Sequence, residues 1–279
     1  MGAMSLPTHD FVVRFKNIPE GAEGDLRFAF EGADLLVVCE SHLRDSARYA
    51  PEGWGTVQFG SSDGARGTHG RVTIYWRKAR FRLVSSSNPL MNEANGLHFP
   101  GAKRYATQGT FLDLLTGWYW DLEGDHFVPH ADLDKRSGVI TTMPRGRLAV
   151  TPAIKSLVTR LKRSRRGQKI RVGDLNVDLS NDLRIRDNGM IEQFNRAGLY
   201  DVSQLLGTRV PDTHGNQTYD WIMVDLVGSR RTWVKPNPRA WVIASGVGPK
   251  RKSDHRDRFF RVRTRARRGW KVPAGAGPR

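Results

Sequence analysis

The sequence predicts a mixed α/β or α+β fold, arranged as a sandwich of two sheets flanked by helices. Short apolar runs of strand character recur along the whole chain, and polar residues stand where many of these runs end. Nothing within the 279 residues resembles a linker. One domain over residues 11–268 is therefore expected.

The N-terminal half is built from short runs rich in β-branched and aromatic residues, separated by Gly/Ser/Asp clusters. These runs predict strands at 11–16, 34–39, 56–60, 71–77 and 81–86. A short helix is predicted over 23–31, between the first two strands. Residues 87–104 show no clear period and are expected to form a long surface loop.

The C-terminal half carries the clearest helix. Thr151 is suited to the N-cap and Pro152 to the first helical position, an apolar stripe follows at helical spacing, and Gly167 ends the segment. A second helix is predicted at 188–197. Strands are predicted at 169–173, 219–226 and 260–267. In the last of these, arginines alternate with apolar residues, which predicts one arginine face.

The ends of the chain and its cysteine content indicate the cellular compartment expected for the protein. Residues 1–10 are interpreted as an expression scar and flexible N-terminus without a signal peptide, and the Pro/Gly/Ala-rich residues 269–279 as a disordered tail. No stretch approaches the length of a transmembrane helix. The single Cys39 excludes an internal disulfide framework. A reducing, cytoplasmic location is therefore expected.

Polar residues that suit a catalytic site follow the strand-like runs in a fixed order. They are Asn17, Glu40, His130, Asp174, Asn176, Asp220, Asp254 and His255. Such groups are costly in a core, but they suit a site built on the rigid end of a sheet. Carboxylate and amide oxygens together with histidine fit Mg²⁺-assisted phosphate chemistry.

These positions, with Gly-Asp-Leu-Asn at 173–176 and Ser-Asp-His at 253–255, resemble the endonuclease/exonuclease/phosphatase superfamily, which includes DNase I and exonuclease III. The resemblance runs from Phe11 to Val262. Each motif alone is weak, whereas all of them in family order make a strong signal. The resemblance implies a four-layer α/β/β/α sandwich of two mixed sheets, as in DNase I.

The resemblance also implies roles. Glu40 and Asp254 would bind Mg²⁺, which Mn²⁺ could replace. Asp174 would orient or deprotonate the attacking water. Asn176 would fix a phosphate oxygen or the metal. A carboxylate–imidazole pair, Asp220 and His255, would hold the phosphate.

Two further roles and two departures from the family pattern complete the comparison. His130 would donate a proton to the leaving oxygen, and Asn17 would anchor the phosphate or the metal shell. Cys39 stands where the family usually has Gln, and Pro19 where its apurinic branch has an acidic residue, which disfavours an abasic-site enzyme. His126 is interpreted as a loop or packing residue.

The net charge of +17 is concentrated in two segments. Residues 155–171 carry eight Lys/Arg and no acid, and residues 250–271 carry eleven Lys/Arg and two acids, which accounts for the whole excess. Two basic segments on a neutral body favour nucleic acid, and DNA first, as the partner. Anionic lipid headgroups and a merely solubilising surface are the alternatives. Substrate contacts are assigned to the arginine face, at Arg261, Arg263, Arg265 and Arg267.

The predicted function is a Mg²⁺-dependent nuclease that hydrolyses DNA with little sequence preference, since no groove-reading motif is evident. One alternative is a phosphatase or lipid phosphodiesterase built on the same site. Another is a catalytically silent nucleic-acid-binding protein, against which the complete set of polar positions argues. Trp118, Tyr119 and Trp120 could stack bases, although clustered aromatics before a strand more often form core. The sequence indicates no oligomeric state.

Overall fold

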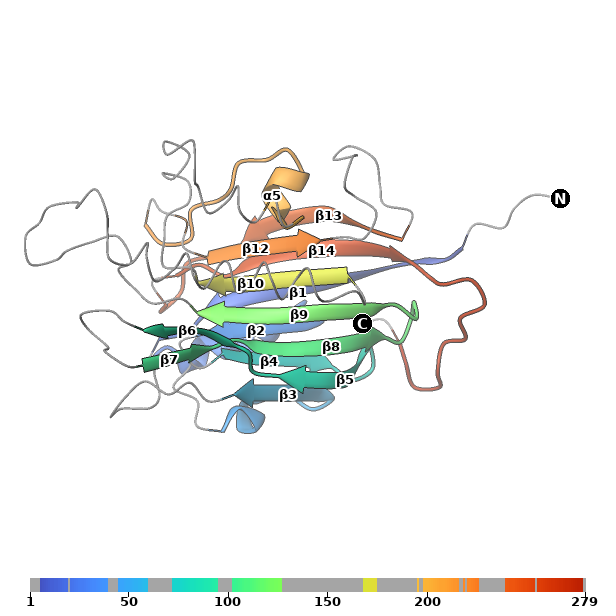
Figure 1. The fold of residues 1–279 in the computed structure, drawn as a ribbon, viewed down its shortest axis with the longest axis horizontal. Helices are drawn as coiled ribbons and strands as arrows, with labels where there is room; N and C mark the ends of the chain where they lie inside the picture. The colour runs from blue at the N-terminus through green and yellow to red at the C-terminus, as the bar shows by residue number, and fades with distance from the viewer. Residues whose placement is uncertain are drawn as a thin grey trace, which may run out of the picture.

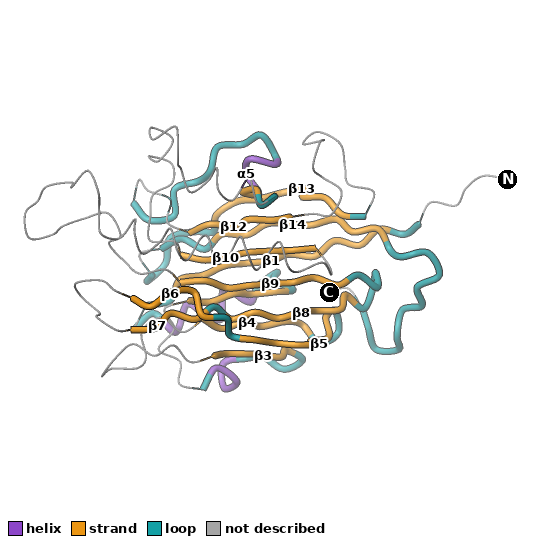
Figure 2. Tube along the Cα trace, viewed as in Figure 1, coloured by secondary structure: helices purple, strands orange, loops and turns teal. Residues whose placement is uncertain are grey.

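The computed structural model describes residues 6–19, 21–39, 45–59, 72–94, 102–126, 168–174, 195, 198–215, 218, 220–225, 239–253 and 255–277. Two six-stranded sheets pack face to face, with a two-stranded ribbon beside them (Figure 1). Strands and loops make up most of the described chain, and helices are few (Figure 2). The two mixed sheets of a DNase I-like sandwich are thereby confirmed. The helix predicted from Thr151 lies outside the described residues, as does most of that at 188–197.

The first sheet contains strands from both ends of the described chain. In spatial order they are β13 (Ala240–Val247), β14 (Arg258–Arg265), β1 (Thr8–Asn17), β2 (Leu35–Cys39), β4 (Val72–Arg77) and β3 (Trp54–Phe59). β1 and β2 are parallel and the other pairs antiparallel. The parallel pair needs a crossover, which the 3-10 turn η1 (Glu23–Asp25) and the helix α1 (Leu26–Phe30) supply. On the outer face of the sheet, Phe30 packs edge-on against Tyr75.

The second sheet provides the other layer of the sandwich. In spatial order its strands are β11 (Tyr200–Asp201), β12 (Asp220–Asp225), β10 (Gln168–Asp174), β9 (Tyr119–His126), β8 (Thr107–Asp113) and β5 (Phe81–Ser87). β9 and β10 are parallel. Two short helical turns complete the described elements, η2 (Ser46–Tyr49) and α5 (Val202–Leu205). No helix among the described residues is long and apolar enough to cross a bilayer.

The ribbon corrects one expectation. Residues 87–104 were predicted to be a loop, but they include β6 (Leu90–Ala94) and β7 (Ala102–Tyr105), which pair antiparallel. The register shifts between Leu90 and Asn92, and an irregularity of this kind interrupts the two-residue period by which a strand is recognised in sequence. The loop prediction was therefore wrong at these strands.

The hydrophobic core fills the space between the two sheets. Phe11 of β1 meets Trp120 of β9 edge-on, with ring centroids 4.8 Å apart. Trp120 is completely buried, so the core interpretation of this aromatic holds, whereas Tyr119 beside it is 40% exposed. Burying a large apolar side chain contributes about 1.5–3 kcal/mol, and this core fixes the register that positions the strand ends.

The segment after β14 follows a defined path where the sequence predicted a disordered tail. Trp270 Nε1 donates to the carbonyl oxygen of Leu114 at 2.9 Å, and the amide of Gly277 donates to that of Ala79 at 3.1 Å. The Trp270 ring lies so close to Gly117 (φ +73°) that a side chain there would collide with it. These hydrogen bonds attach the segment to turns next to strands of the second sheet. A composition rich in Pro, Gly and Ala does not indicate such contacts.

Candidate active site

On four strands, the core-facing series of side chains terminates in a polar residue at the same end of the sandwich. Alternate residues of a strand point to one face, and the buried apolar series of β1 leads to Asn17. By the same alternation, His126, Asp174 and Asp220 extend the core-facing series of β9, β10 and β12. All four residues are between 0 and 3% exposed. The candidate site is thus the polar continuation of the hydrophobic core.

Asp174 lies at the centre of this arrangement. Its Oδ2 accepts a 2.9 Å hydrogen bond from Nδ2 of Asn17, which joins the ends of β1 and β10 across the two sheets. Within its own sheet, Asp174 lies in register with Asp220 on one side and His126 on the other. Adjacent strands are separated by about 4.8 Å, so the three backbones hold their side chains close together.

His255 and Asp220 form a carboxylate–imidazole pair. Nδ1 of His255 lies 2.9 Å from Oδ2 and 3.1 Å from Oδ1 of Asp220. A carboxylate only accepts hydrogen bonds, so the ring nitrogen that faces it carries the proton. Asp220 therefore fixes both the tautomer and the orientation of the imidazole.

Ser253 attaches this histidine to the first strand. Its Oγ donates to the carbonyl oxygen of Asn17 at 2.8 Å and accepts from the amide of His255 at 3.2 Å. The amide of Ser253 in turn donates to Oδ2 of Asp25 at 3.1 Å. The serine of the Ser-Asp-His motif thus has a positioning role in this fold.

Lys16 supports the same turn from the other face of β1. Its ammonium donates to the carbonyl oxygen of His255 at 2.7 Å. Burial lowers the pKa of Lys16, and the carboxylates of Asp257, Asp25 and Asp220 partly oppose that shift. A buried cation beside the pair adds positive potential to the region where a phosphate would lie.

Arg258 anchors the beginning of β12. Its Nη1 donates to the carbonyl oxygen of Asp220 and to Oδ2 of Asp201, both at 3.0 Å. Arg258 and Asp201 are completely buried, and removing one partner of such a pair leaves an uncompensated charge. The amide of Asp220 also donates to Oγ1 of Thr213 at 3.2 Å. These hydrogen bonds hold the backbone of Asp220 in place, and its side chain contacts His255.

The cluster has a donor set that could hold a metal ion. One ligand atom each from Asp174, Asp220 and His255 lies within 4.8 Å of the others. Oδ1 of the buried Asn17 has no hydrogen-bond partner among the described residues, and such an acceptor costs about 1–3 kcal/mol. A cation would remove that cost. Oxygen-rich ligands of this kind fit a hard divalent ion.

The structure brings four of the predicted site residues together. Asn17, Asp174, Asp220 and His255 share one end of the sandwich. Four other predicted positions lie outside the described residues, namely Glu40, His130, Asn176 and Asp254.

The arginine face of β14 runs away from this end. Arg261 pairs with Val12 and Arg265 with Thr8 in the antiparallel register with β1. Thr8 and Asn17 are the two ends of a ten-residue strand, which spans roughly 30 Å at ~3.3 Å per residue. In Figure 1, β9 and β10 point left toward the site, whereas the chain leaves β14 on the right. The structure therefore does not bring the four arginines together with the polar cluster.

Two histidines near the cluster were not assigned to a site from the sequence. His126 is the buried last residue of β9 and lies beside Asp174, in a strand rather than in a loop. In the sequence, Trp120, Leu122 and Gly124 alternate with acidic residues. This alternation could have predicted that His126 continues the core-facing series. His214 forms an isolated β-bridge with His255, and their ring centroids are 4.9 Å apart. It precedes β12 in an irregular segment, so no local pattern marks it.

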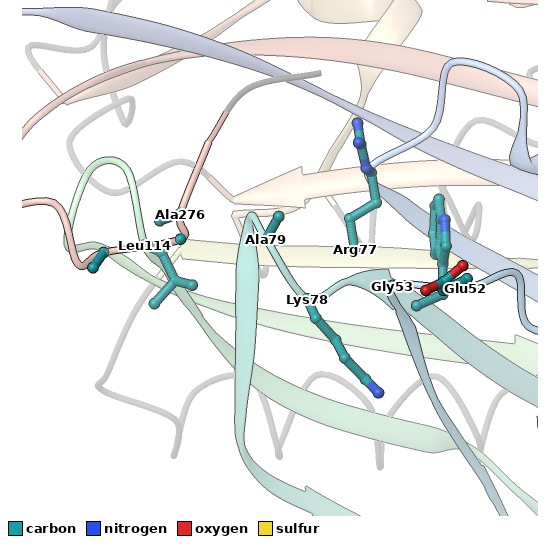
Figure 3. Close-up of a pocket in the computed structure, with 10 residues that line it drawn as sticks. Glu52, Gly53, Arg77, Lys78, Ala79, Leu114 and Ala276 are labelled. Atoms are coloured by element: carbon teal, nitrogen blue, oxygen red, sulfur yellow. The ribbon is translucent and has the colours of Figure 1, made fainter.

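The cavity in Figure 3 is separate from the polar cluster. It measures about 400 Å³, and its lining includes Lys78, Leu114 and Ala276. Arg77, which also lines it, bonds through its amide to Asp34 just before β2 begins. The other end of β2 lies in register with Asn17. The cavity is thus at the far end of the sandwich.

No protein-family model matches the chain, and no curated protein matches it in sequence. Solved structures do match its fold. An endonuclease/exonuclease/phosphatase family protein from Bacteroides thetaiotaomicron has a TM-score of 0.61 at 16% identity, covering 92% of this chain and 99% of that one. A mannosyl-6-phosphatase from Bacteroides thetaiotaomicron VPI-5482 has a TM-score of 0.60 at 17% identity, covering 90% and 99%.

Another similar structure is D. rerio TDP2 complexed with a single-strand DNA product, with a TM-score of 0.58 at 13% identity, covering 91% of this chain and 98% of that one. Identities this low establish the fold alone. The chain has the fold of the endonuclease/exonuclease/phosphatase proteins, as the sequence resemblance implied.

Proposed function

We propose that the protein is a Mg²⁺-dependent phosphodiesterase, and specifically a nuclease that hydrolyses DNA with little sequence preference. The observation that carries this proposal is the buried cluster of Asn17, Asp174, Asp220 and His255 at one end of the sandwich. Polar groups withdrawn from water are unfavourable in a core, but they are suited to orienting a charged phosphoryl group. The fold of D. rerio TDP2, complexed with a single-strand DNA product, supports DNA as the substrate class.

In this proposal Asp174 orients or deprotonates the attacking water. Asn17 keeps the carboxylate in place through the 2.9 Å hydrogen bond between the sheets. His255 holds the phosphate: its Nδ1 proton is directed to Asp220, so the substrate meets Nε2. With Nδ1 held by Asp220, the imidazole is oriented so that Nε2 faces the phosphoryl oxygens.

A proton for the leaving oxygen comes from another histidine. Among the described residues, His126 is a candidate, because it lies in register with Asp174. His130 remains a prediction outside the described residues.

The residues present fit a divalent metal on the Asn17 side of the cluster. Both oxygens of Asp220 face His255, so this carboxylate is committed to the imidazole. Asn17 lies in register with Cys39, which directly precedes Glu40. Glu40 and Asp254 remain the proposed ligands, and Asn176 a proposed phosphate or metal contact. A bound Mg²⁺, or Mn²⁺ in its place, would neutralise charge on the phosphoryl oxygens.

A direct assay tests this function. Purified protein would be incubated with supercoiled plasmid and with single-stranded DNA, in Mg²⁺ and in EDTA. We expect nicking of the plasmid in Mg²⁺, its loss in EDTA, and its loss in Asp174→Asn. Intact plasmid and intact single strands after prolonged incubation in Mg²⁺ and in Mn²⁺ would exclude a DNA nuclease.

The second candidate is a phosphatase on the same site, which the fold likeness to a mannosyl-6-phosphatase favours. A compact cluster of this kind serves a phosphomonoester as well as a diester, because both present charged phosphoryl oxygens. Release of inorganic phosphate from sugar or inositol phosphates, with the plasmid left intact, would identify this alternative. Binding of DNA without any turnover would instead identify a silent binding protein.

A further inference from the structure

Exposed arginines cluster at the end of the sandwich remote from the candidate site. Phe260 and Val262 of β14 face the core, so Arg261 and Arg265 face outward by alternation. Arg239, at the start of β13, is adjacent, since its carbonyl oxygen accepts from the amide of Arg265. Three more cations follow β14 in the chain. The exposed members of the cluster are Arg239, Arg261, Arg265, Arg267, Arg268 and Lys271.

One partly exposed aromatic side chain, Trp118, lies among these arginines. Trp118 donates from Nε1 to the carbonyl oxygen of Arg265 at 2.8 Å. The guanidinium carbons of Arg239 and Arg267 lie 4.8 Å and 5.3 Å from the centroid of its ring. The surface therefore combines guanidinium groups with an indole ring.

Two nearby carboxylates are already engaged by other arginines. Asp10 accepts from Nε and Nη2 of Arg263 at 2.7 and 2.8 Å, and the hydrogen bond from Arg263 lowers the pKa of Asp10. Asp113 pairs with the buried Arg80 at 2.9 Å. These two acids consequently do little to neutralise the exposed arginines.

We propose that this surface is a second nucleic-acid-binding surface, distinct from the active site. Guanidinium groups suit it to backbone phosphates, which they contact through paired hydrogen bonds. The partly exposed ring of Trp118 suits it to an unstacked base. A surface for anionic lipid would need only charge, whereas the combination with an indole ring favours a polynucleotide.

The inference rests on the proposed function only in taking DNA as the polymer. Along β1 the surface extends from roughly 17 Å (Arg261, opposite Val12) to roughly 30 Å (Arg265, opposite Thr8) from the active site, at ~3.3 Å per residue. These distances correspond to about five to nine base steps of ~3.4 Å. A duplex longer than about ten base pairs is thus long enough to contact both places. The arginines would retain a long substrate while the chemistry takes place elsewhere.

The test compares two double variants of the full chain. In Arg261→Gln/Arg265→Gln the surface loses two charges. In the matched control, Arg27→Gln/Arg48→Gln, two exposed arginines of α1 and η2 are lost instead. Binding to a 20-base-pair duplex would be measured at several salt concentrations in EDTA, so that no cleavage interferes.

The surface variant should lower the slope of log affinity against log salt by about 1.8, that is ~0.9 for each lost phosphate contact, with the control slope unchanged. An unchanged slope in the folded surface variant, or an equal loss in both variants, would overturn the proposal. So would a loss confined to binding of vesicles that contain phosphatidylserine.

A second readout separates this proposal from the proposed function. Hydrolysis of bis(p-nitrophenyl) phosphate should proceed at the same rate in the surface variant as in the wild-type protein, because the substitutions are remote from the cluster. Should the wild-type protein cleave nothing while the slope still falls, the nuclease proposal would fail and the surface would stand.

Discussion

At the scale of single residues, the candidate site depends on side chains that share hydrogen bonds. Asn17, Asp174 and Asp220 stand at the ends of three strands, and the rings of His255 and His214 lie against the same end. The strand residues among them are held by backbone pairing between strands that pack on the hydrophobic core. Substitutions that preserve shape therefore separate chemistry from folding.

Asp174→Asn removes one charge and keeps the volume and the contact with Asn17. We expect phosphodiester cleavage to fall by roughly 10²–10³-fold, as when a group aimed at the reacting phosphate is lost. The melting temperature without metal should not fall. Asp45→Asn, at a 59% exposed carboxylate, is the matched control and should keep full activity. A folded Asp174→Asn protein that retains more than a tenth of the wild-type rate would remove Asp174 from the mechanism.

Asp220 should act on the substrate only through His255, because both of its oxygens face the imidazole. His255→Gln should reduce turnover more than binding, and Asp220→Asn should cause a smaller defect of the same kind. A double-mutant cycle measures the coupling. The double variant should match His255→Gln alone. Losses in ΔΔG‡ that simply add would show that the two residues work independently.

At the scale of elements, the strands that read as short apolar or alternating runs were predictable. The runs at 11–16, 34–39 and 169–173 correspond to β1, β2 and β10. Asn17 and Asp174 were located because each directly follows such a run. Local pattern was sufficient here because burial alone selects the residues on a core-facing side.

Other elements follow from contacts between distant segments, which no local pattern contains. β8 and β13 were not predicted, and β6 and β7 were taken for a loop. The direction of β14 relative to the site depends on its pairing with β1, so the sequence indicated an arginine face but not where that face lies relative to the site. His214 is likewise brought to His255 only by the tertiary fold.

Gly173 tests the packing of the element that carries Asp174. A Cβ atom at this position would collide with the backbone oxygen of Asp125 on β9, and paired strands cannot easily separate to admit it. Gly173→Ala should therefore lower the free energy of unfolding by about 1–3 kcal/mol, measured in urea. Gly24→Ala is the control, since nothing lies within 4 Å of its added Cβ. Equal stability of the two variants would show that β9 and β10 adjust freely.

At the scale of the whole molecule, the two sheets are linked at both ends. Asn17 bonds to Asp174 at the site end. At the far end, Trp118, just before β9, bonds to the backbone of Arg265 in the first sheet, and Trp270 bonds to Leu114. These far-end hydrogen bonds join neutral indole N–H groups to backbone carbonyl oxygens. By contrast, the site end brings two buried carboxylates within 4.8 Å, so it stores an electrostatic cost that a bound cation would relieve.

That contrast predicts how metal affects stability. In EDTA, Asp174→Asn should be at least as stable as the wild-type protein, because one of two neighbouring negative charges is gone. With Mg²⁺ the order should reverse, since an ion that binds only the folded state stabilises it by mass action, by about 1.4 kcal/mol at ten times its Kd. Thermal unfolding of both proteins at matched ionic strength, with Mg²⁺ or with NaCl, measures the difference. The matching matters because a chain of net charge +17 responds to salt itself. Equal Mg²⁺-induced shifts in the two proteins would place any bound cation away from Asp174, and the metal would then have to be assigned to residues beyond this cluster.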